Sequence, residues 1–269
     1  MSFGGWPENQ HYGVEGPRGF AGHPPRVAPW FQSAAITDGF STSVVATAPA
    51  DIKIGDLLLA VCSTRDDSSS NWVLPTGWFN LVPVFAAGGT DRGGRRIAYK
   101  IANDADTKVA SWTFATVGNN NQQINIICIR GIDPDPIGGF YNSFSVAQPG
   151  KWCAGVTSRF INDRYGTSGT VGINHIPQIC VPEPGCLVVV CTTGQTNNNG
   201  FHPVWTYGAP YSSLSQGGAF RTGASWGIAR PERAGVFPTT SASLSMSSGG
   251  GETNTEHVTT ICIRGALQP

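Results

Sequence analysis

The stretch Gly223-Ala224-Ser225-Trp226-Gly227 places a serine at the spacing of a nucleophile elbow, the pattern that supports covalent catalysis in many hydrolases. An elbow works because a sharp strand-to-helix turn exposes its serine beside an oxyanion hole. Here the surrounding residues read as a strand, and Pro231 stands where the helix would have to continue. The pattern therefore indicates a strand serine rather than a nucleophile.

Histidines and paired carboxylates, the other groups that could do acid–base chemistry, lie in loops. Two carboxylates flanking a sugar could hydrolyse a glycosidic bond, and the candidate pairs are Asp66/Asp67, Asp104/Asp106 and Asp133/Asp135. The last pair flanks Pro134 in a turn, where Asp commonly bonds backbone amides. We therefore expect no catalytic residue, no metal site and no cofactor. Of the three functional hypotheses that the sequence leaves, two of which are given below, an enzyme acting on surface polysaccharide is the least favoured.

The chain has seven cysteines, but their placement does not indicate a disulfide framework. Four of them sit inside apolar runs, where a thiol behaves as a small core side chain: Cys62, Cys128, Cys191 and Cys262. Cys153, Cys180 and Cys186 lie in looser sequence, and whether these loop thiols oxidise stays open. No Cys-x-x-Cys spacing is present, which argues against zinc.

The sequence Ile-Cys-Ile-Arg-Gly occurs twice, at Ile127–Gly131 and at Ile261–Gly265. Other landmarks recur in the same order, among them the apolar runs that begin at Leu57 and Leu187. The separation suits a duplicated small domain rather than a solenoid repeat. Arg130 and Arg264 end equivalent apolar strands, so we expect each guanidinium to tie its strand end to loop carbonyls or a carboxylate.

Short apolar or alternating segments, separated by Gly, Asn and Asp clusters, predict an all-β protein without long helices. The run from Asp56 to Thr64 predicts a central strand buried on both faces. We expect two tandem antiparallel β-sandwiches of jelly-roll type. The predicted organisation is an extended Pro/Gly-rich arm (1–35), a first sandwich (36–133), a connecting segment (134–164) and a second sandwich (165–269).

The arm has no periodic apolar pattern and cannot form a core alone, yet it is rich in aromatic residues. Its candidate anchors are Trp6, Phe20, Trp30 and Phe31. The arm either folds back on its own domain or lies across a neighbouring subunit.

Aromatic residues bracket corresponding loops of the two units and suggest a platform for stacking on sugar rings. The candidates are Trp72, Trp205, Tyr207 and Tyr211. The alternative is that these rings close the ends of each sandwich core.

Charged residues make up 13% of the chain, with 17 basic and 17 acidic side chains. Nucleic acids and anionic membranes require a concentrated basic surface, so neither is an expected partner. The start of the chain lacks the pattern of a secretory signal, and no apolar run is long enough to span a membrane. We expect synthesis in the cytoplasm of a host cell.

Four segments in order resemble virion surface proteins of tailed bacteriophages over about residues 50–140 and more weakly in the second unit. They are Gly55–Val61, Pro75–Trp78, Ala98–Ala102 and Ile129–Pro134. The resemblance implies a structural β-sandwich or jelly-roll protein on the particle exterior, without catalytic residues. Its partners would be major capsid or tail proteins and copies of itself.

The absence of a coiled-coil or collagen-like shaft favours capsid decoration or cementing, with anchoring through the N-terminal arm. The alternative is a tail-fibre or receptor-binding module that contacts a host surface glycan.

Overall fold

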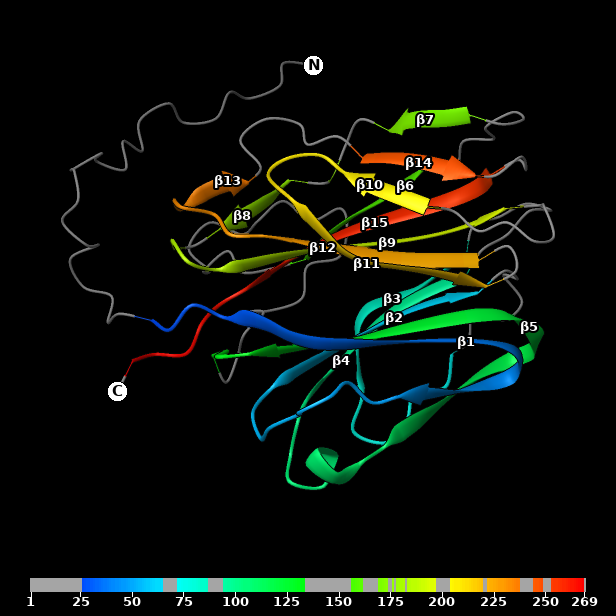
Figure 1. The fold of residues 1–269 in the computed structure, drawn as a ribbon, viewed down its shortest axis with the longest axis horizontal. Coiled ribbons are helices and arrows are strands. Elements are labelled where there is room, and N and C mark those ends of the chain that lie inside the picture. Colours follow the sequence, from blue (N-terminus) through cyan, green and yellow to red (C-terminus); the bar gives the residue numbers. More distant parts are fainter. Residues whose placement is uncertain are drawn as a thin grey trace, which may run out of the picture.

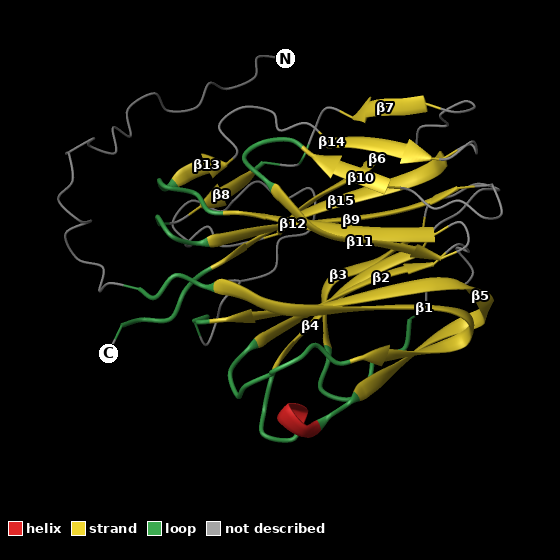
Figure 2. Ribbon diagram, viewed as in Figure 1, coloured by secondary structure: helices red, strands yellow, loops and turns green. Residues whose placement is uncertain are grey.

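The computed structural model describes residues 26–64, 72–86, 94–133, 156–161, 169–173, 176, 178–181, 183–196, 204–219, 222–237, 244–248 and 253–268. Trp6 and Phe20 lie outside these residues. The described chain consists of strands and one short 3-10 helix, η2 (Asp106–Lys108), and every strand pair is antiparallel. The predicted all-β class is confirmed (Figure 2).

The strands of the first half (residues 26–133) are β1 (Trp30–Thr47), β2 (Leu57–Thr64), β3 (Phe79–Ala86), β4 (Gly94–Ile101) and β5 (Ser111–Arg130). Those of the second half (residues 156–268) are β6 (Val156–Ile161), β7 (Gly169–Ile173), β8 (Ile179–Val181), β9 (Leu187–Thr196), β10 (Val204–Tyr207), β11 (Ser212–Ala219), β12 (Thr222–Ala229), β13 (Gly235–Phe237), β14 (Leu244–Ser248) and β15 (Thr253–Ile263).

Each half contributes one five-stranded sheet, and the two sheets have the same strand order. The first runs β1-β5-β2-β4-β3, and the second runs β6-β15-β9-β12-β11. The register matches as well, because Leu57 lies opposite Ile129 in the first sheet and Leu187 lies opposite Ile263 in the second. The Ile-Cys-Ile-Arg-Gly repeats therefore occupy the same place in both sheets.

Smaller irregularities also recur in both halves. The pairing of β3 with β4 is interrupted by a β-bulge between Asn80 and Val82, and that of β11 with β12 between Ser213 and Ser215. Bulges redirect a strand at a defined point, and this one lies at the equivalent position of both sheets; a second irregularity, between Val82 and Phe85, occurs in the β3–β4 pair alone.

The two five-stranded sheets stack face to face, and smaller sheets cover the outer face of the second one (Figure 1). Successive side chains of a strand point to opposite faces, so β2 contributes to two cores. Leu57, Leu59 and Val61 enter the core between the two large sheets, whereas Leu58 and Ala60 enter the outer core of the first half. All eight residues of β2 are buried, as the apolar run predicted.

The second half follows the same rule. Leu187 and Val189 of β9 enter the central core, and Val188 and Val190 enter an outer core that β8 and β10 help to close. The central core thus joins both halves of the chain, since it is lined by β2, β4 and β5 on one side and by β9, β12 and β15 on the other.

In the first half, the outer face of the large sheet is covered by the same long strands that build it. β1 and β5 curve at one end and return beneath the sheet, as Figure 1 shows. Residues 43–47 of β1 pair with residues 111–115 of β5 after a bulge. In the second half, the outer sheet is formed by separate strands in the order β10-β14-β7.

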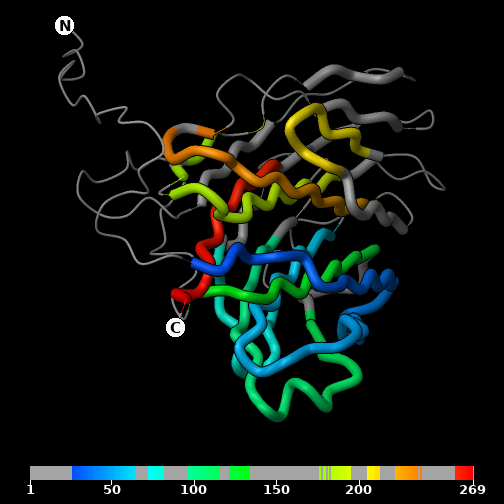
Figure 3. Tube along the Cα trace, turned by 60° about the vertical axis from the view of Figure 1, so that its left-hand side comes forward, coloured from blue at the N-terminus to red at the C-terminus, as the bar shows by residue number. Residues whose placement is uncertain are grey.

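The predicted ends of the arm and of the connecting segment do not coincide with the ends of the observed strands. β1 begins at Trp30, so the last residues of the expected arm belong to the first sheet. β6 lies within the expected connecting segment and pairs with β15. Ahead of β1, Arg26 forms a bridge with Leu267, and the two ends of the described chain lie side by side (Figure 3).

Candidate functional site

Several exposed apolar side chains of the first half lie along β1. This strand is an edge of the first sheet, and in the described residues its strand partner is β5. Phe40 is 63% exposed and Val45 is 58% exposed, and Ile36 is exposed as well. We call Ile36 and Phe40, which precede the bulge at Ser41, the β1 edge patch; Val45 lies beyond this bulge.

The composition of β1 leaves this edge without the usual protection. Edge strands are commonly guarded by Lys, Pro or inward-pointing charges, which prevent another strand from adding to the sheet. β1 contains no Lys, Arg or Pro, and Asp38 is its one charged residue. The part of this edge between the two bulges, residues 33–41, can accept a further strand through backbone hydrogen bonds.

The sequence did not indicate this patch, because Asp38 and Gly39 interrupt the apolar pattern of the strand. A usable signal was present: an 18-residue stretch that combines Val, Ile, Thr and Phe without a single Lys, Arg or Pro.

The described arm anchors pack inside their own chain. Phe31 lies against Trp226 of the second sheet, with ring centroids 4.8 Å apart. Trp30 stacks on the backbone at Gly131, where an added Cβ would lie 2.5 Å from the indole ring. Residues 30–31 thus pair with β5 and contact their own chain, as in the alternative that the arm folds back, while Trp30 stays 38% exposed.

The structure also corrects the candidate aromatic platform. Trp72, Trp205, Tyr207 and Tyr211 are all buried. Trp72 packs in the outer core of the first half, and the other three pack in that of the second half. A sugar ring needs an open aromatic face, so these four rings belong to the core, which was the alternative that the sequence left open.

The serine of the elbow-like pattern is buried in strand β12. The hydroxyl groups of Ser225 and Tyr207 are hydrogen-bonded at 2.9 Å, and those of Tyr207 and Thr192 at 2.7 Å. Burial and bonding within a strand leave Ser225 no access to a substrate.

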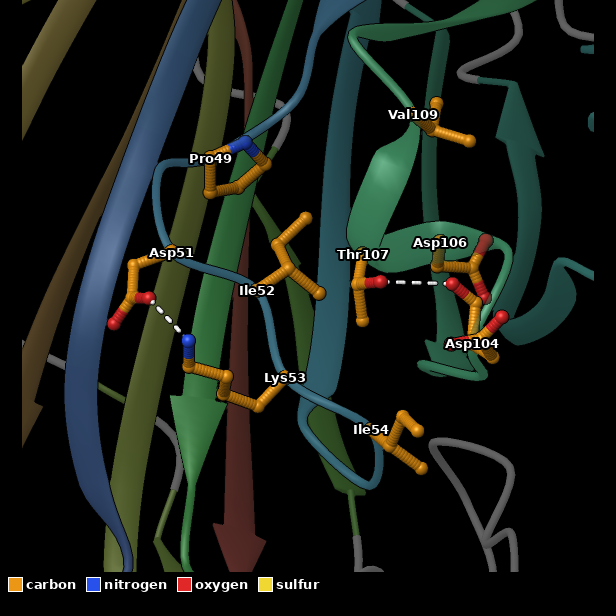
Figure 4. A pocket seen from close by; sticks show the side chains of 9 residues that line it. All are labelled: Pro49, Asp51, Ile52, Lys53, Ile54, Asp104, Asp106, Thr107 and Val109. Carbon is orange, nitrogen blue, oxygen red and sulfur yellow. Dashed lines mark hydrogen bonds and ion pairs between the residues drawn. The ribbon is translucent and has the colours of Figure 1, made fainter.

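An open depression of about 590 Å³ lies at the end of the first half, between the turn before β2 and η2 (Figure 4). Its charged residues already have partners. Lys53 Nζ lies 2.8 Å from Asp51 Oδ1, and Asp104 Oδ2 lies 2.9 Å from Lys108 Nζ. The Lys53 ammonium, by hydrogen bond and charge, lowers the pKa of the Asp51 carboxyl below its usual value, with a smaller contribution from Arg130.

Asp104 and Asp106, one of the carboxylate pairs considered above, have separate structural roles there. Asp106 is buried, forms an ion pair with Lys100 at 2.7 Å and accepts the backbone N–H of Asn103 at 2.9 Å. The pair therefore fixes the turn around η2. The depression combines these paired charges with the exposed side chain of Ile54.

Arg130 ties the end of β5 to a carboxylate, in the way the sequence suggested. Its Nε and Nη2 donate to Oδ1 and Oδ2 of Asp56, each at 2.9 Å, and the Cys128 thiol donates to Oδ2 at 3.3 Å. Asp56 is buried directly before β2. These hydrogen bonds raise the pKa of Arg130, so the guanidinium stays charged.

The residue equivalent to Asp56 in the second half is Cys186, directly before β9. Its neighbours at the end of β15 are Cys262 and Arg264. Cys62, Cys128, Cys186, Cys191 and Cys262 are all buried, and none of them forms a disulfide.

Side chains of β5 reach across the central core to the backbone of β12. Asn125 Nδ2 donates to the carbonyl oxygen of Ala224 at 3.1 Å, and the N–H of Ala224 donates to Oε1 of Gln123. Both donors and acceptors are buried. These polar contacts fix the position of one large sheet on the other, which apolar packing alone does not do.

A second link between the halves is Arg26. Its guanidinium pairs with Asp133 at the end of the first half and lies 2.8 Å from the Glu183 carboxylate of the second half. It also donates to the carbonyl oxygen of Gly265 at 2.8 Å.

In the part of the chain that the structure describes, no helix has the length and apolar character needed to cross a membrane. Comparisons of the chain with family models, with curated proteins and with solved structures find no match.

Proposed function

We propose that the protein is a structural component of the exterior of a tailed-bacteriophage particle, acting as a capsid decoration or cement protein. The β1 edge patch is the observation that supports an assembly role. It presents exposed apolar side chains beside an unguarded sheet edge, and such surfaces mark contacts between proteins. The resemblance of residues 50–140 to phage surface proteins supports the location.

The occupant that we propose for this edge is a second copy of the chain. In a symmetric pair the same edge is available on both molecules, and antiparallel addition of one β1 to another would form a continuous sheet. Asp38 is the one charge on either strand, so a register that separates the two Asp38 residues is favoured.

We further infer that each half of the chain is a jelly-roll-like unit and that the two arose by duplication. The identical strand order, matched register and matched bulges support this inference. On this interpretation, one face of the ancestral sheet became part of the central core. The edges of the sheets stayed available for contacts in an assembly.

The β1 contact is tested by substituting Phe40→Lys and measuring molar mass by light scattering across a concentration series. The matched control is Ile54→Lys, at an exposed position in the turn before β2 and away from the β1 edge. We expect the wild type and Ile54→Lys to associate and Phe40→Lys to stay monomeric. A monomeric wild type at high concentration, or unchanged association of Phe40→Lys, would contradict the contact.

The location is tested by counting copies per particle with quantitative mass spectrometry. Copies in the hundreds would support capsid decoration. A dozen or so would support the alternative, a tail-fibre or receptor-binding module that contacts a host glycan, and absence from particles would exclude both.

The anchoring role of the arm is tested by deleting residues 1–25, because residues 26–35 contribute to the fold. Normal incorporation of the shortened protein would contradict anchoring.

A further inference from the structure

The two halves differ chemically at one equivalent position, the residue that precedes the central strand. In the first half this residue is Asp56, whose carboxylate is held by Arg130 and Cys128. In the second half it is Cys186. The matched register between β2–β5 and β9–β15 makes Cys262 the counterpart of Cys128 and Arg264 the counterpart of Arg130.

The strand register brings Cys186 and Cys262 together. Cys262 lies opposite Val188, and Cys186 is two residues from Val188 on the same face. The two cysteines are thus diagonal neighbours in an antiparallel pair, as are Asp56 and Cys128 in the first half, where the thiol and the carboxylate lie 3.3 Å apart. Both are buried in the outer core of the second half, and their thiols are hydrogen-bonded to each other.

The surroundings of this pair lower the pKa of one thiol, Cys186, below its ordinary value. The hydrogen bond from Cys262 lowers the pKa of Cys186, as does the positive charge of Arg264, while burial and the Glu183 carboxylate act in the opposite direction. Tyr211 also packs in this core, and burial raises the pKa of its hydroxyl, so it stays neutral. In the first half the reverse holds, because burial and the Asp56 carboxylate raise the pKa of Cys128.

We propose that Cys186 and Cys262 are an oxidisable dithiol that closes to a reversible disulfide when the folded protein meets a peroxide. This inference does not depend on the proposed function. The bond would join the start of β9 to the end of β15 and so close a long loop, residues 187–261, which reduces the entropy of the unfolded chain.

The chemistry balances with hydrogen peroxide as the oxidant. The Cys186 thiolate attacks one peroxide oxygen, the O–O bond breaks, and the departing hydroxide takes up a proton to give water. The resulting sulfenic acid is attacked by the Cys262 sulfur, the S–S bond forms, and a second water leaves. Two thiols lose two electrons and two protons in all, and the peroxide is reduced.

The test is to treat the reduced full-length protein with hydrogen peroxide, block remaining thiols with N-ethylmaleimide in denaturant, and map the peptides by mass spectrometry without reduction. We expect one linked pair, Cys186 with Cys262, and a thermal midpoint several degrees higher that dithiothreitol reverses. Sulfinic acid at Cys186 without a link, or a link of Cys186 to another cysteine, would overturn the proposal.

Matched variants separate the dithiol from general thiol oxidation. Cys128→Ser removes the equivalent thiol of the first half. We expect this variant to keep both the Cys186–Cys262 disulfide and the reversible rise of the thermal midpoint. Cys186→Asp recreates the first-half arrangement beside Arg264, and we expect it to fold but to lose the shift. If Cys186→Asp failed to fold, Cys262→Ser would serve as the second variant. If peroxide still raised the thermal midpoint of a folded Cys186 or Cys262 variant, the assignment of the disulfide to these two cysteines would be contradicted.

Discussion

The guanidinium of Arg130 holds both carboxylate oxygens of Asp56, with two nitrogen–oxygen distances of 2.9 Å. This pair closes the end of β5 onto the start of β2, in the middle of the first sheet. It also explains why an arginine follows the Ile-Cys-Ile sequence of the first repeat, since this strand end needs a donor that can bind two oxygens at once.

Removing Arg130 should therefore destabilise the fold strongly. Arg130→Ala leaves the buried Asp56 carboxylate without its cation, and breaking such a pair typically costs about 3–5 kcal/mol. The measurement is the free energy of unfolding in urea. Lys108→Ala, which breaks the exposed pair with Asp104, should cost only about 0.5 kcal/mol. Similar losses for both variants would contradict the role of Arg130.

Substitution of Gly265, the last residue of the second repeat, should also be costly. A Cβ built there would lie 1.7 Å from the carbonyl oxygen of Val27, so backbone must move. We expect Gly265→Ala to release residues 26–29 from the C-terminal segment and to lower the thermal midpoint. In Gly235→Ala the added Cβ meets no atom within 4 Å, so that variant suffers only the strain of its positive φ. An equal effect of the two substitutions would count against the close approach.

The contact between Phe31 and Trp226 should stabilise the stacking of the two large sheets. We expect Trp226→Ala to lower the free energy of unfolding by about 3–5 kcal/mol, because a fully buried indole is lost from the central core. Phe79→Ala, at an exposed ring, should have little effect. A double-mutant cycle with Phe31→Ala should give a coupling of about 0.5–1.5 kcal/mol, and a coupling near zero would show that the rings do not interact.

The bond from the Ala224 N–H to Gln123 predicts a specific pattern of hydrogen exchange. Gln123→Ala removes the acceptor, so exchange of the Ala224 amide should become faster in a site-resolved measurement. The neighbouring Gln122 bonds instead to the carbonyl oxygen of Ser41, and Gln122→Ala should leave Ala224 unchanged. Acceleration by both variants would indicate general loosening of the sheet.

The Asp51 carboxyl should titrate below its usual range. Its pKa is lowered chiefly by Lys53, so Lys53→Ala should raise it toward the ordinary value. Because the pKa is depressed in the folded state, the stabilising effect is present above the unfolded pKa and is lost as the pH falls through the folded pKa. Carboxyl chemical shifts followed by NMR would show both effects, and an unchanged Asp51 titration in the variant would contradict the pairing.

Much of the local structure could be predicted because it depends on neighbouring residues. The near-continuous apolar run at 56–64 required a strand with both faces buried, and β2 has that character. The two Ile-Cys-Ile-Arg-Gly sequences required equivalent strand ends, and they occupy equivalent registers. The alternation of side chains along each strand then assigned residues such as Leu57 and Leu58 to opposite faces.

The predictions that failed depended on contacts between residues far apart in the chain. Nothing near Trp205 or Trp72 distinguishes a core ring from an exposed one, because burial follows from the sheet that packs over it. Phe31 looked like a residue of a free arm until its neighbour, Trp226, was known.

The sequence by itself determined the strands, their two-faced alternation and the repetition, because these arise from side-chain size and polarity along a short stretch of backbone. Only the tertiary structure decided that the halves share a central core, that β1 forms an exposed edge, and that Cys186 meets Cys262. Each of these depends on which strands become neighbours, and that choice is made by the packing free energy of the whole chain.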